Sequence, residues 1–314
     1  MFTQESGCKY KRKPLVAAML SLIMAGLGHI YCGKVIKGLI FVFLCTVPFA
    51  VIAGLFIHDA TIKVSFMIIT GLALSVVSLV AIIDSWYLAK HTKPDYELKE
   101  YNRWYVYLLL WLISMGGSTT YSLYFRDNYM EAFRISTASN YPTMAPGDRF
   151  LANKLAYRNK NPKRGDLVVF VNPQNRRVNF VKRVVAIAGD TVEIKGNDLY
   201  INGQKLERSK LSDSILSEIK VEVQGEMLKG DVYEETNNGA KYKIFLKFGV
   251  DPNSANFAKV TVPKYHCFVL GDNRNQSEDS RHFGPVPLAA IKARADYLYW
   301  PAKDWARFGR LGPD

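Results

Sequence analysis

The sequence predicts a multi-segment α-helical membrane anchor followed by a mostly β domain. Four stretches of twenty or more residues contain no Asp, Glu, Lys or Arg, and all of them end before residue 126. From residue 132 onward the chain changes to short β-rich segments that are punctuated by Gly, Pro and Asn. We therefore expect a membrane region at 1–125 and a folded domain at 126–314. Within that domain, 206–256 is richer in charge and less apolar, which indicates an inserted subdomain.

The apolar stretches are long enough to cross a bilayer. An α-helix rises about 1.5 Å per residue, so about twenty residues span the roughly 30 Å hydrocarbon core. A cleaved secretory signal is excluded, because the apolar runs exceed the length of its short central region and recur along the chain. The sequence thus predicts three or four transmembrane helices, drawn from 14–33, 38–57, 64–83 and 104–125.

Charge sets the expected topology. The net charge is +13, but the longest basic run is "KYKRK" at 9–13, which favours orientation in the membrane and contact with anionic lipid over binding to nucleic acid. Lys and Arg gather before the first apolar stretch, between the first and second, and between the third and fourth. If these clusters are cytoplasmic, either the first stretch, which contains "GLGHIYCG", is re-entrant, or the N-terminal tail lies outside. Both topologies are multi-pass and place everything after residue 125 on the non-cytoplasmic side.

Two further features bear on ligands. Asp84, near the end of the third stretch, is followed by Trp86, Tyr87 and Lys90, which is typical of a membrane–water interface. An intramembrane functional carboxylate is the alternative. The five histidines and four cysteines show no metal-ligand spacing, so we expect neither a metal nor a cofactor. The sequence indicates no particular oligomeric state.

The second half contains several strand candidates. They alternate or run apolar over four to ten residues and end at Gly-Asp, Asn-Gly or Asn-Pro turns. We expect few helices beside them. The candidates are "DLVVFV", "NFVKRVVAIA", "DTVEIKGNDLYINGQKL", "KYKIFLKF", "KVTVPKYHCFVLGDN" and "ARADYLYW".

Ser139 lies in a segment suited to hold a nucleophile. Residues 135–150 read "ISTASNYPTMAPGDRF", in which small hydroxylic residues precede two prolines and a glycine. This composition stiffens a loop more than it fills a core. A serine nucleophile needs a group that takes its proton, either a histidine or a lysine. His266 and His282 stand in poor contexts for this role, although a histidine triad stays an alternative.

Lys182 is the candidate base. In "VNFVKRVVAIAGD" it has apolar neighbours, among which a charged side chain is costly. A lysine with an ordinary pKa is neutral in only about four molecules per ten thousand at pH 7, whereas lowering its pKa to about 8 takes roughly 3 kcal/mol, which burial can supply. Strand alternation predicts that Lys182 and Arg183 point in opposite directions, one inward and one outward. A lysine that snorkels to the surface is the structural alternative.

Four sequence boxes follow one another after the apolar stretches. They read "STASNYPTMAPGD", "RGDLVVF", "NFVKRVVAIAGD" and "VLGDNRNQSEDSRHFG". In order and spacing, over about 134–300, they resemble the boxes of the bacterial type I signal peptidases, the membrane-bound leader peptidases. The resemblance implies a catalytic domain of the signal-peptidase type, a Ser-Lys dyad, and a place on the outer face of the bacterial cytoplasmic membrane.

The resemblance also implies roles for single residues. Ser139 would be the nucleophile and Lys182 the general base, while Thr137 would donate its hydroxyl to the oxyanion hole beside the backbone N–H of Ser139. Ser277 would orient the lysine amine. Asn140 departs from the family pattern, which usually has methionine there, and this changes the pocket beside the scissile bond. The charged residues expected to brace the site, with solvated turn charges as the alternative, are Arg183, Asp272, Asp279 and Arg281.

The predicted function is the removal of N-terminal signal peptides from exported preproteins by a membrane-bound serine endopeptidase. The implied preference is for small residues before the cut, Ala-X-Ala-like, in a substrate that adds to the β domain as an extended strand. Two alternatives stay open. One is a dedicated processing protease of a pilus or conjugation system, which the extra membrane segments and Asn140 suggest. The other is a non-catalytic membrane adaptor of the export machinery.

Overall fold

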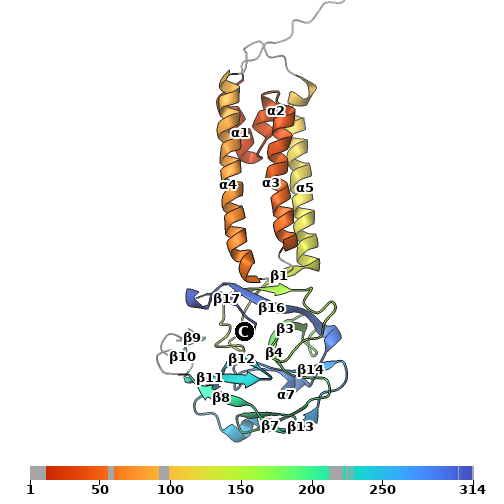
Figure 1. The fold of residues 1–314 in the computed structure, drawn as a ribbon, viewed down its shortest axis with the longest axis vertical. Coiled ribbons are helices and arrows are strands. Elements are labelled where there is room, and N and C mark those ends of the chain that lie inside the picture. The colour runs from red at the N-terminus through yellow and green to blue at the C-terminus, as the bar shows by residue number, and fades with distance from the viewer. Residues whose placement is uncertain are drawn as a thin grey trace, which may run out of the picture. The chain divides into compact units, whose positions relative to one another are not determined.

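Two compact units make up the chain, at Met1–Phe125 and Arg126–Asp314. The first is built of helices and the second mainly of strands (Figure 1). The computed structural model describes residues 12–55, 60–91, 99–211, 222–223, 226–227, 229–302 and 304–312.

The first apolar stretch forms two short helices and no spanning helix. The chain leaves α1 after Ile23 and enters α2 after Gly26, whose φ of 101° is one that glycine adopts readily. With 10 residues, α1 covers about 15 Å, half of a hydrocarbon core. Of the two topologies left open for 14–33, the short helices α1 and α2 fit the one in which "GLGHIYCG" is re-entrant. The helices are α1 (Pro14–Ile23), α2 (Leu27–Tyr31), α3 (Val35–Leu55), α4 (Ala60–His91), α5 (Trp104–Asn128) and the short α7 (Ser280–Phe283).

The longer helices of the first unit differ in how well they suit a bilayer. Within the described residues, Ile69–His91 of α4 is the one segment long and apolar enough to cross a membrane. The helix α3 has 21 residues and α5 has 25. Figure 1 shows α1 and α2 beside one end of these longer helices.

Three side chains from separate helices meet inside the helical unit. Asp84 Oδ2 of α4 lies 2.7 Å from His29 Nε2 of α2 and 2.7 Å from Lys37 Nζ of α3. His29 is fully buried and stacks on Phe41, with 4.6 Å between the ring centroids. Asp84 thus ties α2 and α3 to α4.

The second unit is mostly β, and its main sheet has eight strands. Seven of them run in the order β1-β2-β16-β3-β4-β14-β15, with β17 paired to β16 and every pairing antiparallel. The apolar runs of β3 and the second half of β4 are buried, because both strands lie in the middle of this sheet. The main-sheet strands are β1 (Met130–Arg134), β2 (Arg149–Asn153), β3 (Leu167–Val171), β4 (Asn179–Ile187), β14 (His266–Leu270), β15 (Val286–Pro287), β16 (Ile291–Trp300) and β17 (Gly309–Arg310).

Smaller sheets complete the unit, in the orders β13-β5-β6-β7, β12-β11-β8 and β10-β9. Two hairpins close at Asn-Gly pairs, Asn202-Gly203 and Asn238-Gly239, in which both residues have positive φ as a type I′ turn requires. All six strand candidates contain strands; the strands outside the candidates are β1, β2, β8, β9, β10, β11, β15 and β17. The remaining strands are β5 (Thr191–Lys195), β6 (Asp198–Ile201), β7 (Gln204–Lys205), β8 (Glu207–Lys210), β9 (Glu222–Val223), β10 (Glu226–Met227), β11 (Gly230–Asn237), β12 (Ala240–Lys247) and β13 (Phe257–Thr261).

The described part of 206–256 forms its own sheet but shares a core with the rest of the domain. Val232 of β11 and Phe245 of β12 pack in one buried cluster with Ala138 and Tyr141, which flank Ser139 in the sequence. Phe245 N also donates to Asp272 O at 2.8 Å. This sheet therefore supports the loop that carries Ser139.

Candidate active site

Ser139 lies in a closed loop between β1 and β2. Ile135 N donates to Asp148 O and Gly147 N donates to Ile135 O, both at 2.8 Å, so the ends of the loop meet. The buried Asp148 carboxylate accepts from Ala145 N at 2.7 Å. It also pairs with Arg307, at 2.7 and 2.9 Å. The loop is thus fixed at both ends and along its second half.

Lys182, on β4, contacts Ser139. Lys182 Nζ of β4 lies 2.7 Å from Ser139 Oγ, although the two residues are 43 positions apart in the chain. The lysine is only 4% exposed. Its amine lies 5.4 Å from the centroid of the Phe180 ring. A hydroxyl and an amine are therefore in direct contact in an environment with little water.

Burial changes the proton affinity of this amine. Desolvation lowers the pKa of Lys182 to about 8, although Asp279, Asp272 and Glu278 act to raise it. At pH 7 about one lysine in ten is then neutral, compared with about four in ten thousand at the ordinary pKa. The amine is consequently available as a base near neutral pH, and the buried position argues against a lysine that snorkels to the surface.

The hydroxyl of Ser139 has a second polar neighbour. Thr137 Oγ1 lies 3.2 Å from Ser139 Oγ, and its side chain is exposed. Among the described residues, neither His266 nor His282 forms a hydrogen bond to Ser139: the ring of His266 bonds Lys264 O at 2.9 Å. The geometry therefore favours lysine over histidine as the partner of Ser139.

Arg183 is buried as deeply as Lys182, which corrects one expectation. The two side chains leave β4 in opposite directions, as strand alternation predicts, but neither points outward, because β4 is covered on both faces. Arg183 is 2% exposed and holds Asp272 through two hydrogen bonds of 2.7 Å. Asp272 also accepts from Thr143 Oγ1 at 2.6 Å. This pair fixes the loop after Ser139 against β4.

Asp279 and Arg281 form a second buried pair. Arg281 donates twice to the Asp279 carboxylate, each time at 2.8 Å, and Gly271 N donates to it at 3.0 Å. Burial opposes the charged form of Asp279, but the hydrogen bonds and charge of Arg281 hold its pKa below the ordinary value. The Asp279 charge, which acts to raise the pKa of Lys182, is thus paired with Arg281.

Ser277 lies near the pair of Ser139 and Lys182 without bonding the lysine. Its hydroxyl is buried and lies beside the Asp279 carboxylate, whose pKa it helps to lower. A Cβ placed on Gly271 would lie 2.2 Å from Ser277 Oγ and 2.4 Å from Ser139 O. Only glycine at 271 therefore lets Ser277 and the backbone of Ser139 approach so closely. The expected hydrogen bond from Ser277 to the lysine amine is not present in this structure.

Sequence reasoning missed residues that hold the nucleophile segment. Asn273, buried after β14, donates from its backbone to Ser139 O at 3.1 Å and from its side chain to Ala138 O at 3.2 Å. Asn273 lies in the same sequence box as Asp272, but as an uncharged residue in a polar run it gave no indication of a role at the site. Arg274 and Glu235 form a buried ion pair behind it. Arg274 and Glu235 are 39 residues apart in the sequence, and no local sequence pattern indicates that they meet.

A cleft of about 240 Å³ opens at Ser139. Residues 133–137, at and after the end of β1, line it together with 178–182, at the start of β4. Its apolar lining residues include Phe133, Ile135, Phe150, Phe180 and Val181.

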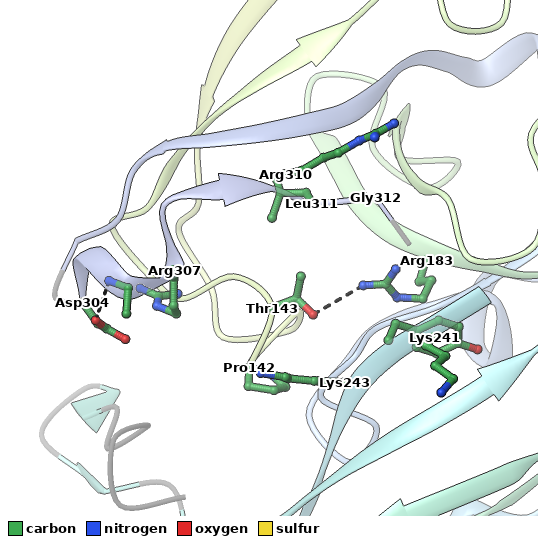
Figure 2. Close-up of a pocket in the computed structure, with 12 residues that line it drawn as sticks. Pro142, Thr143, Arg183, Lys241, Lys243, Asp304, Arg307, Arg310, Leu311 and Gly312 are labelled. Atoms are coloured by element: carbon green, nitrogen blue, oxygen red, sulfur yellow. Dashed lines mark hydrogen bonds between the residues drawn. The ribbon is translucent and has the colours of Figure 1, made fainter. Parts of the chain in front are cut away.

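A second cavity, of about 300 Å³, lies along Pro142, Thr143 and the C-terminal residues (Figure 2). Neither Ser139 nor Lys182 lines it. Within the described residues no cluster of three potential metal ligands occurs. In the cleft, the Ser139 hydroxyl and the buried Lys182 amine lie within hydrogen-bonding distance of each other, a pairing that can support nucleophilic chemistry.

Comparison with known proteins gives the family. Residues 104–300 match the family described as signal peptidase, peptidase S26. A signal peptidase I of Aquifex aeolicus (strain VF5) is 34% identical over 211 aligned residues, covering 58% of this chain and 80% of the relative. One of Bacillus caldolyticus is 32% identical over 196 residues, covering 62% and 91%. The solved signal peptidase I of Enterococcus faecalis V583 is 30% identical and covers 43% of this chain and 97% of that one, with a TM-score of 0.26.

The chain therefore belongs to the signal peptidase family, peptidase S26, and is a serine endopeptidase that cleaves signal peptides. The non-catalytic adaptor is no longer needed as an explanation. Residues before 104, which include α1 to α4, lie outside the matched region.

Proposed function

We propose that Ser139 is the nucleophile and Lys182 the general base of signal-peptide cleavage. The observation that carries this proposal is the 2.7 Å contact between Lys182 Nζ and Ser139 Oγ in a buried setting. A base must lie within hydrogen-bond reach of the proton that it removes and must be unprotonated near the working pH. Lys182 meets both conditions.

The reaction then runs in two halves. Neutral Lys182 takes the hydroxyl proton as Ser139 Oγ attacks the scissile carbonyl, and a tetrahedral intermediate forms. The lysine returns that proton to the leaving amine, so the mature protein departs with a free N-terminus and the signal peptide stays as an ester on Ser139. Lys182 next takes a proton from water as that water attacks the ester, and it gives this proton to Ser139 Oγ when the ester bond breaks, so the signal peptide leaves with a carboxylate and both residues are restored.

Thr137 and the backbone N–H of Ser139 are proposed donors to the oxyanion of the intermediate. The threonine hydroxyl already lies 3.2 Å from Ser139 Oγ, so it is close to the carbon that Ser139 attacks. A donor of this kind contributes about 3 kcal/mol to transition-state stabilisation. The pairs Arg183 with Asp272 and Asp279 with Arg281 are proposed as supports that fix the loop and β4, and Ser277 as a close neighbour that orients the amine.

The substrate is proposed to lie extended in the cleft between 133–137 and β4. Both walls present main-chain groups to the groove, which suits binding by strand addition. The cleft volume of about 240 Å³, shared among several side chains, favours small residues before the cut, Ala-X-Ala-like. Preproteins that carry signal peptides meet this description.

We also propose that the helical unit crosses the cytoplasmic membrane of a bacterium three times, through α3, α4 and α5, with α1 and α2 as a re-entrant hairpin that contacts lipid. A helix of 10 residues is too short to cross, whereas α3, α4 and α5 have 21, 32 and 25 residues. With the basic clusters cytoplasmic, three crossings place the β unit on the outer face.

The test is cleavage of a purified preprotein by the full detergent-solubilised chain and by two variants. Ser139→Ala and Lys182→Ala are expected to stay folded in thermal melts and to lose cleavage, while the wild type cuts after a small residue. A Lys182→Ala variant that cuts as fast as the wild type would overturn the proposed mechanism. Asn140 and the helices outside the matched region keep one refinement open: a narrow substrate set, which a profile of cleaved preproteins would reveal.

A further inference from the structure

The side chain next to the nucleophile bonds directly to the strand that carries the base. Asn140 Nδ2 donates to Val181 O at 2.7 Å, across 41 residues of sequence. Asn140 follows Ser139, and Val181 precedes Lys182. We propose that Asn140 is a positioning residue that fixes the distance between Ser139 Oγ and Lys182 Nζ. This inference rests on the roles proposed above for Ser139 and Lys182.

The bond lies at an open edge of β4. The residues Val178 and Val184 use their main-chain groups toward β3, at 2.8 to 3.0 Å. Because main-chain groups of successive strand residues face opposite sides, those of Val181 face away from β3. On that side β14 pairs with β4 only from Arg183 onward. Within the described residues no strand pairs with 179–182 there, so the Asn140 amide occupies the place where a neighbouring strand would supply an N–H.

The burial of the Asn140 side chain lowers the stability of the domain. It is 2% exposed, and its Oδ1 accepts no hydrogen bond from the described residues. The opposite orientation of the amide would set Oδ1 against the Val181 carbonyl, two acceptors facing each other. A buried acceptor without a donor lowers stability, and an apolar side chain of the same shape avoids that cost. A residue that lowers stability and lies beside the reacting groups indicates a role in placing those groups relative to each other.

The geometry acts on Lys182 through β4. The groups that face its amine are Asp279, Asp272 and Glu278, which raise its pKa, and Arg281, which lowers it, while desolvation is the largest influence. Without the Asn140 bond, the loop and β4 lose one direct link at the cleft. Water then reaches the amine more easily, its desolvation weakens, and the acid limb of the pH–rate profile moves to higher pH.

The test uses variants matched in size. Asn140→Leu keeps the shape without the donor, and Asn140→Gln and Asn140→Met have equal length but differ in the donor. The full chain in detergent is assayed for kcat and KM on a preprotein, for the acid-limb midpoint, and for thermal unfolding. We expect Leu and Met to lower kcat about fivefold with KM within twofold and a higher midpoint, with melting unchanged or higher, and Gln to retain more activity than Met.

Two results would overturn the inference. One is Leu and Met variants as fast as the wild type. The other is a loss of rate that follows a loss of melting temperature with the midpoint unchanged, which marks a structural role. Lys182→Ala is assayed in parallel. If this variant cleaves normally, Lys182 is not the base, so both the proposed function and the inference about Asn140 fail. If it is inactive while the Asn140 variants cleave like the wild type, only the inference fails.

Discussion

Two lysines, one in each unit, form short hydrogen bonds to very different partners. Lys182 Nζ bonds the hydroxyl of Ser139 at 2.7 Å, and Lys37 Nζ bonds the carboxylate of Asp84 at 2.7 Å. Lys182 is 4% exposed, whereas the Lys37 side chain is 48% exposed. Burial lowers the pKa of Lys182 to about 8, whereas Lys37 forms a half-exposed ion pair with Asp84. The partner and the burial, more than the residue type, decide which lysine is able to act as a base.

The β unit keeps carboxylates near Lys182 without letting them bond it. Asp272 is held by Arg183, and Asp279 by Arg281, each through two hydrogen bonds. Arginine stays protonated in proteins, so it neutralises a carboxylate without titrating. Arg183 and Arg281 each bond a carboxylate near Lys182, and so keep Asp272 and Asp279 from bonding its amine.

The largest expected effect comes from removing each lysine in turn. Lys182→Met is expected to lower the cleavage rate about a thousandfold or more, because Lys182 is the one basic side chain among the described residues that bonds Ser139 Oγ. Lys37→Met, an equal change in the helical unit, alters the rate less than twofold. Single-turnover cleavage of a preprotein measures both. Equal losses in the two variants would break the comparison.

The same substitution is expected to stabilise the β unit. The pKa of Lys182 is about 8 in the folded chain against an ordinary 10.5, so the unfolded chain binds more protons between these values and wild-type stability rises with pH across that window. Below pH 8 the buried charge costs about 3 kcal/mol, part of which is offset by the Ser139 bond. Lys182→Met is therefore expected to gain about 2 kcal/mol at pH 7, and the gain fades toward pH 10.5.

Thermal or denaturant unfolding of the full chain at pH 7 and at pH 10.5, followed by a signal from the β unit, measures this gain. A variant that is less stable than the wild type at pH 7, or equally stabilised at both pH values, contradicts the buried charge as the cause.

A medium effect is expected from Arg281. Arg281→Met leaves the Asp279 carboxylate without its partner, and that charge then stabilises the ammonium form of Lys182. The pKa of Lys182 rises, so the acid limb of the pH–rate profile moves upward, by about one pH unit. The double variant with Asp279→Asn removes both charges and is expected to return the midpoint toward that of the wild type. A midpoint that stays shifted in the double variant assigns the effect to packing.

The sequence predicted the chemistry of the site better than its supports. The sequence boxes indicated that Ser139 and Lys182 act together, and the apolar neighbours of Lys182 indicated the burial of its amine. The burial of Arg183 was missed, because alternation gives the direction of a side chain but does not tell whether both faces of the strand are covered. Asn140 was noticed only as a departure from methionine. Its bond to Val181 depends on how the loop folds back onto β4, and no local pattern contains that information.

The membrane unit shows the same limit. Counting charges found the apolar stretches, and the glycines of "GLGHIYCG" set 14–33 apart from the others, but they did not show the packing there: a Cβ on Gly28 would lie 2.2 Å from Ala17 O. Such close packing of one short helix on another is invisible in a hydropathy pattern. Asp84 was interpreted as an interfacial residue, and its contacts with His29 and Lys37 join positions 55 and 47 residues away. Many pairs of opposite charges at such a sequence distance are possible, and only the fold shows which of them meet.

The smallest expected effect belongs to Asp84. Asp84→Asn keeps the size of the side chain but removes the charge that pairs with Lys37, whose side chain is 48% exposed. The exposed pair with Lys37 contributes well under 1 kcal/mol, and the amide of Asn still hydrogen-bonds the buried His29, so melting of the helical unit is expected to fall only slightly. Cleavage should stay within twofold of the wild type, and the acid-limb midpoint should not move, because the groups that set the pKa of Lys182 all belong to the β unit. A shifted midpoint would mean that the charge cluster of the helices acts on the catalytic lysine, and the two lysines could then no longer be treated as independent.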